Sequence, residues 1–142
     1  MTSSTADFQV IAVDQRGRGL SDKPSDGYDC DTLAADMAGL MDALGHQSFA
    51  LYGTDTGTPI AYAVAAGYPD RVERLIVAEA PLPGISPSPP LFAPAPLNER
   101  YYHIAFNRTA AANEQLVRGR EDIFFGNEFD IFAARKLPDY AA

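Results

Sequence analysis

The sequence predicts an α/β protein built on a partial, doubly wound parallel sheet. Through residues 8–80, short apolar runs alternate with segments of helical periodicity, and turn-forming residues separate them. Alternation at this spacing is typical of parallel strands joined by right-handed crossovers, with helices on both faces of the sheet. A proline-rich segment ends the pattern, and only helical periodicity follows it. We therefore expect a second, helical region.

Three short apolar runs predict the strands. Residues 8–13 (FQVIAV) form a continuous apolar run, which is typical of a strand buried on both faces. Residues 14–24 are rich in Gly, Ser, Asp and Pro and predict a loop. Residues 48–52 and 74–80 predict the second and third strands.

Two helices are expected between these strands. Apolar residues at helical spacing predict the first over residues 33–44, with Asp29 or Asp31 as its N-cap and Gly45 at its end. Residues 57–68 predict the second, with one proline in its first turn and another just past its end.

The C-terminal region reads differently. Seven prolines within residues 81–96 exclude a regular element there, and helices are expected over 98–106 and about 114–135. Three phenylalanines of the second of these helices are expected on one face: Phe125, Phe129 and Phe132. We therefore divide the chain into a partial core, residues 1–83, and a linker with a partial helical region, residues 84–142.

Composition excludes several classes of protein. Hydrophobic residues make up 46% and charged residues 21% of the 142 residues, as in ordinary globular domains. The formal net charge of −8 argues against binding to nucleic acid or to anionic membrane surfaces. The single cysteine, Cys30, excludes an intrachain disulfide, and residues 1–7 lack the pattern of a signal peptide. We expect a cytoplasmic protein that needs no cofactor and no metal.

Residues 53–57 (GTDTG) carry the candidate chemistry. They match the G-x-nucleophile-x-G pattern of a nucleophile elbow, between the second strand and the second helix. Such a turn forces Asp55 into a strained backbone conformation, while Gly53 and Gly57 allow strand and helix to pack closely. The helix N-terminus favours an anion at Asp55, and the N–H of Thr56 is placed to stabilise an oxyanion. An aspartate here implies attack on an alkyl carbon, giving an ester that water must cleave.

This segment also fits two other patterns. One is a plain glycine-rich turn in which Asp55 caps the helix, which the flanking strand and helix patterns disfavour. The other is the D-T-G-T triplet of aspartic proteases, which residues 55–58 match. Those triplets lie in an all-β setting, whereas an alanine-rich helix follows here.

Several motifs in order resemble the epoxide hydrolase and dehalogenase branch of the α/β-hydrolase family. Residues 14–24 resemble its D-x-R-G-x-G-x-S-D-K-P loop, and residues 53–57 its G-x-D-x-G turn. Four further stretches resemble its Y-P-D-R-V-x-R-L-V, E/D-A-P-x-P-G, W-H-F-x-F and V-x-G-R-E segments: residues 68–77, 79–84, 102–107 and 117–121. The resemblance covers nearly the whole chain and implies a partial α/β-hydrolase fold with a helical cap.

Residues around the nucleophile position separate the members of this branch. Haloalkane dehalogenases usually carry Trp directly after the nucleophile, where this chain has Thr56 and contains no Trp at all. Haloacetate dehalogenases carry arginines where this chain has Thr56 and Pro59, and a cap Trp where it has Ile104. The resemblance therefore implies an epoxide hydrolase acting on a small apolar or weakly polar epoxide. A dehalogenase-like hydrolase is the alternative.

In that group a cap Tyr or His donates a hydrogen bond to the epoxide oxygen. By position His103 is the first candidate, with Tyr102 or Tyr101 next, and the alternative for His103 is a packing role. The resemblance also implies an H-G-x-P loop, an acid and a water-activating histidine, and we find no match for these three. We therefore expect a fragment in which the ester on Asp55 persists, with exposed sheet edges that cause weak folding or self-association. A non-catalytic interaction module is the rival interpretation.

Overall fold

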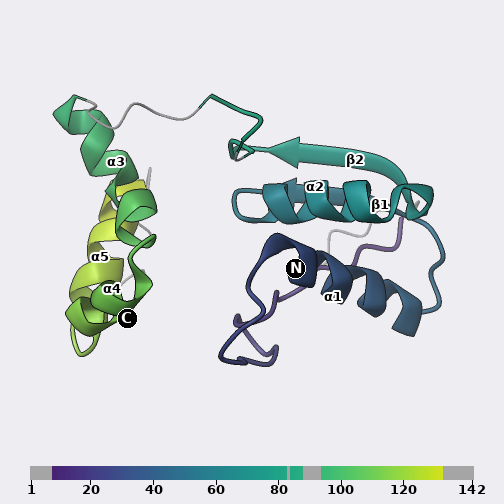
Figure 1. Cartoon of the computed structure of the whole chain (residues 1–142), viewed down its shortest axis with the longest axis horizontal. Helices are drawn as coiled ribbons and strands as arrows, with labels where there is room; N and C mark the ends of the chain where they lie inside the picture. Colours follow the sequence, from purple (N-terminus) through teal and green to yellow (C-terminus); the bar gives the residue numbers. More distant parts are fainter. Residues whose placement is uncertain (1–7, 83, 88–93, 133–142) are drawn as a thin grey trace. The chain divides into compact units, whose positions relative to one another are not determined.

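The computed structural model describes residues 8–82, 84–87 and 94–132. The chain divides into two compact units, Met1–Ser88 and Pro89–Ala142, and each is described by itself. The first unit contains α1 (Cys30–Ala43), β1 (Phe49–Thr54), α2 (Gly57–Gly67), the 3-10 turn η1 (Pro69–Arg71) and β2 (Val72–Ala78) (Figure 1). The second contains α3 (Ala95–Phe106), α4 (Ala110–Val117) and α5 (Glu121–Phe132).

The sheet of the first unit is a parallel pair. β1 and β2 align so that Tyr52 lies beside Ile76. This confirms the α/β class and the parallel sheet. β2 begins and ends two residues before the third predicted strand, residues 74–80. It ends at Ala78 because Glu79 has a φ of 66°, which is incompatible with an extended strand.

The first predicted strand is wrong. Residues 8–13 form no strand, and Phe8 and Val10 are 73% and 70% exposed instead of buried on both faces. A strand exists only through hydrogen bonds to a neighbouring strand, and in the described residues the sheet consists of β1 and β2 alone. An apolar run therefore does not suffice to make a strand.

Both helices of the first unit form where they were predicted, with bounds that differ by a few residues. α1 begins after Asp29, whose carboxylate accepts a hydrogen bond from the Thr32 N–H at 2.9 Å. This contact selects Asp29 over Asp31 as the N-cap. Gly45, with a φ of +81°, follows the end of α1 as expected.

The core lies between the helices and one face of the sheet. α1 packs against α2, and α2 lies across both strands (Figure 1). Ala34, Phe49 and Val64 from three different elements are buried against one another. The other face of the strand pair is open in the described residues, where Tyr52 is 64% and Ile76 61% exposed.

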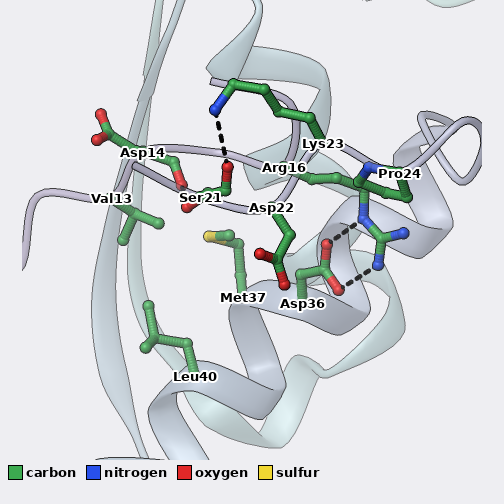
Figure 2. Close-up of a pocket in the computed structure, with 10 residues that line it drawn as sticks. All are labelled: Val13, Asp14, Arg16, Ser21, Asp22, Lys23, Pro24, Asp36, Met37 and Leu40. Carbon is green, nitrogen blue, oxygen red and sulfur yellow. Dashed lines mark hydrogen bonds and ion pairs between the residues drawn. The ribbon is translucent and has the colours of Figure 1, made fainter. Parts of the chain in front are cut away.

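The loop that follows residue 13 is pinned to α1. Arg16 donates two hydrogen bonds to the Asp36 carboxylate, at 2.7 and 2.8 Å. These bonds hold the pKa of Asp36 below its ordinary value. Figure 2 shows this pair beside an open hollow of about 710 Å³ with an apolar lining from Val13, Met37 and Leu40. The predicted loop is thus confirmed, and the Arg16–Asp36 pair ties it to α1.

The second unit departs from its predicted helices. α3 begins at Ala95 instead of residue 98, because a proline is tolerated in the first turn of a helix. The helix predicted over residues 114–135 is two helices as far as it is described, separated at Gly119, whose φ is +76°. No helix in the described ranges is long and apolar enough to cross a membrane.

The face of the last helix that carries Phe125 and Phe129 is not its inner face. Phe125 and Phe129 are 50% and 54% exposed, whereas Phe124, Glu128 and Ile131 are half-buried. The side chain of Phe132 and residues 133–135 lie outside the described part of the chain. The inner face of α5 is therefore one residue away from the face that Phe125 and Phe129 share.

Candidate active site

The predicted turn at Asp55 joins β1 to α2. β1 ends at Thr54, Asp55 has a φ of 51°, and α2 begins two residues later. Two backbone hydrogen bonds hold this conformation: the Asp55 N–H donates to the Ala78 carbonyl at 3.2 Å, and the Thr58 N–H donates to the Asp55 carbonyl at 2.9 Å. A residue other than glycine occupies this region only where its surroundings enforce it, because the conformation is strained. Asp55 is exposed at the carboxyl end of the sheet.

Close packing at the turn depends on one of the two glycines. A Cβ atom on Gly53 would lie 2.4 Å from the Gly57 carbonyl oxygen and 2.6 Å from the Ala61 Cβ. A Cβ on Gly57 would meet only the Gln15 side chain, at 3.8 Å, which is an ordinary contact. The expectation that both glycines permit the close approach therefore holds for Gly53 and is corrected for Gly57.

Thr58 also fixes the turn, and sequence reasoning missed it. Its side chain is 2% exposed, and its hydroxyl lies 2.7 Å from the Ala78 carbonyl and 3.3 Å from the Gly53 carbonyl. These contacts tie the first turn of α2 to the ends of both strands. The available signal was a polar residue in an otherwise apolar helix start.

The electrostatic setting of Asp55 is that of a helix N-terminus. Thr56 follows it as the N-cap of α2, with helical φ and ψ of −60° and −20° and no hydrogen bond from its side chain to the helix. The N–H groups of a first helical turn carry partial positive charge, which favours a carboxylate and any oxyanion formed beside it. The arrangement can hold negative charge at Asp55.

The three cap candidates lie in the second unit, on α3. Tyr101 is 41% exposed, whereas Tyr102 and His103 are half-buried against α5. The Tyr102 hydroxyl accepts a hydrogen bond from Asn127 Nδ2 at 3.1 Å, and His103 Nδ1 lies 3.6 Å from Glu128 Oε2. Burial raises the pKa of Tyr102, and the Glu128 carboxylate raises it further. Tyr102 and His103 therefore lie together in the second unit. In the first unit, Asp55 lies with the residues that flank it.

Asn127 and Glu128 were missed at the sequence level. Glu128 is half-buried on the inner side of α5, and Asn127 is exposed beside it and reaches the Tyr102 hydroxyl. In the residues that the structure describes, no three His, Cys, Asp or Glu side chains gather as candidate metal ligands.

Comparison with known proteins gives a consistent family. Residues 2–130 match the family model described as the alpha/beta hydrolase fold. The chain is 33% identical over 126 residues to "Epoxide hydrolase 4" of Mus musculus, covering 87% of this chain and 33% of that protein. It is 45% identical over 69 residues to "2-(acetamidomethylene)succinate hydrolase" of Mesorhizobium japonicum, covering 49% of this chain and 25% of that protein.

Solved structures agree with the sequence comparison. The crystal structure of Cfl2 from Burkholderia cenocepacia is similar with a TM-score of 0.71 and 35% identity, over 78% of this chain and 37% of that one. The chain spans at most a third of the length of the two curated relatives. The matched family model covers most of the chain, and the parallel strand pair with its strand–turn–helix at Asp55 is the corresponding fold. The chain belongs to the α/β-hydrolase family.

Proposed function

We propose that Asp55 is the nucleophile of an epoxide hydrolase-type reaction on a small apolar or weakly polar epoxide. The observation that carries this proposal is the φ of 51° at Asp55, at the end of β1 and before the N-terminus of α2. Strained backbone conformations are concentrated at functional sites, because they cost free energy and persist only where the surrounding structure enforces them. The similarity to an epoxide hydrolase supports the substrate class.

The proposed reaction has two steps. A carboxylate oxygen of Asp55 attacks an epoxide carbon, so that an ester C–O bond forms and the ring C–O bond breaks. The ring oxygen takes the electron pair and then a proton from a cap donor, for which His103 is the first candidate and Tyr102 or Tyr101 the next. Water then adds to the ester carbonyl, the Thr56 N–H stabilises the oxyanion, and the diol leaves.

The second step is expected to be slow in this chain. His46 follows α1 and precedes β1, so it lies at the opposite end of that strand from Asp55. Six residues of strand span about 20 Å, which is far beyond the reach of a general base. His103 belongs to the cap candidates of the second unit. We therefore expect the ester on Asp55 to persist.

Intact-mass measurement tests the proposal. After incubation with styrene oxide, the chain should gain the mass of one styrene oxide, and peptide mapping should find it on Asp55. Asp55→Asn should abolish the adduct, because an amide is a poor nucleophile. Asp70→Asn, at an exposed aspartate of η1, should leave it unchanged. If the wild-type chain forms neither an adduct nor the diol, Asp55 is not the nucleophile. If it forms the diol rapidly without an adduct, the expected slow hydrolysis of the ester is wrong.

An alkyl bromide distinguishes the dehalogenase alternative. Displacement of bromide needs groups that hold the departing halide, and the residue after Asp55 is Thr56 instead of Trp. We expect labelling by styrene oxide to be much faster than labelling by a primary alkyl bromide at equal concentration. The reverse order would favour a dehalogenase. A chain that neither reagent labels would favour an interaction module.

A further inference from the structure

We propose that Glu128 is a positioning residue that holds the Nδ1 side of His103 and so fixes which ring nitrogen of the imidazole carries the hydrogen. The substrate contact rests on the proposed function above, whereas the contact between Glu128 and His103 belongs to the second unit alone. Glu128 itself does not touch the reacting atoms in this proposal.

The geometry pairs two consecutive residues of α5 with two of α3. Asn127 donates to the Tyr102 hydroxyl at 3.1 Å, and Glu128 Oε2 lies 3.6 Å from His103 Nδ1. The second distance is that of an ion pair and is longer than an ordinary hydrogen bond. Because both carboxylate and imidazole are carried by packed helices, their separation is set by the helix contact and not by loop motion.

Burial strengthens this contact. The His103 and Glu128 side chains are 27% and 17% exposed, and an aromatic cluster of Tyr102, Phe106 and Phe124 lies beside them. Glu128 Oε1 is buried, and in the described part of the chain no hydrogen bond of normal geometry reaches it. A carboxylate in such surroundings attracts a nearby N–H more strongly than it would in water.

The chemistry of the two groups fixes the consequence. An ionised carboxylate only accepts hydrogen bonds, so a neutral imidazole whose Nδ1 faces it carries its hydrogen on Nδ1. In that form Nε2 accepts and cannot donate. The protonated ring donates at Nε2 and keeps Glu128 as its counter-ion. The form of His103 that could donate to an epoxide oxygen is therefore the imidazolium.

Long-range ¹H–¹⁵N spectra of the labelled full chain test this proposal. Spectra recorded at rising pH, until the His103 signals no longer change, show which nitrogen of the neutral ring is protonated. We expect His103 to carry its hydrogen on Nδ1 in the wild-type chain. A predominant Nε2–H form in the wild type would overturn the proposal without any variant.

Variants separate positioning from packing. Glu128→Gln can donate through its amide, so His103 should change from predominantly Nδ1–H to predominantly Nε2–H. Glu128→Asp, which keeps a carboxylate, should retain the wild-type form, and Glu114→Gln, at an exposed glutamate of α4, should not alter it. Unchanged His103 signals in a folded Glu128→Gln chain would overturn the proposal. Asp55→Asn should leave these signals as they are, so the result is independent of the alkylation test.

Discussion

The two faces of the β1–β2 strand pair differ in what covers them. On one face Val64 of α2 packs against Phe49 of β1, while on the other Tyr52 and Ile76 remain exposed. The contacts that shape the Asp55 turn come from α2 and the ends of the two strands. The turn therefore depends on the covered face, and substitutions on the two faces should have different effects.

Gly53→Ala should have the largest effect on the covered face. The new Cβ would lie 2.4 Å from a backbone oxygen of Gly57, which cannot move without displacing the start of α2. Overpacking of this kind costs about 3 kcal/mol in the free energy of unfolding. Urea unfolding followed by circular dichroism measures the loss, and labelling of Asp55 by styrene oxide should fall with it.

Gly39→Ala is the matched control for that substitution. Gly39 lies in α1 and a Cβ there would meet nothing within 4 Å. Alanine should stabilise the helix by about 0.5–1 kcal/mol. Opposite changes in the free energy of unfolding at the two positions would show that the cost of Gly53→Ala comes from the turn. Equal effects would contradict the close approach at Gly53.

Val64→Ala should have the next largest effect. Val64 of α2 is fully buried against Phe49 and Ala34, so its truncation removes apolar contacts and leaves a cavity. We expect a loss of about 2 kcal/mol in the free energy of unfolding, measured in the same urea experiment. Ile76→Ala, on the open face where that side chain is 61% exposed, should cost less than half as much. Similar losses at both positions would contradict a core confined to the covered face.

Thr58→Val should have a smaller effect that concentrates at the turn. Valine keeps the shape of threonine but removes the hydroxyl that contacts the Ala78 carbonyl at 2.7 Å. The loss of one buried hydrogen bond costs about 1 kcal/mol. Hydrogen exchange of the Asp55 amide, which donates to the same carbonyl, should become faster. Thr54→Val, at an exposed position of β1, should change neither quantity by a comparable amount.

Local signals account for most of what the sequence predicted correctly. The strand and helix that flank Asp55 are each encoded within a few residues, and the spacing of Gly53 and Gly57 identified the turn between them. Thr58 escaped because its partner, the Ala78 carbonyl, is twenty residues away in sequence. The polar residue at the helix start indicates a partner, but which carbonyl it contacts follows from the pairing of the two strands.

Nonlocal contacts also explain the errors. Residues 8–13 have the composition of a buried strand, but pairing decides whether a strand forms. Gly119 lies inside a helical pattern where a glycine is tolerated at about 1 kcal/mol, so the pattern concealed the break. Glu128 was missed because the sequence pattern singles out the face that carries Phe125 and Phe129, whereas α3 packs on the face one residue away.

Lysines on the open face should have the smallest effect on stability. Tyr52→Lys with Ile76→Lys replaces two exposed apolar side chains, and each change should alter the free energy of unfolding by about 0.5 kcal/mol or less. Any self-association through this face should weaken, because two charges would be buried in the contact. Sedimentation velocity over a range of concentrations measures this. Leu20→Lys with Leu44→Lys adds the same charge at exposed sites elsewhere and should leave association unchanged. Equal sedimentation of all three chains would show that the open face does not drive association, and that the expected self-association through it is wrong.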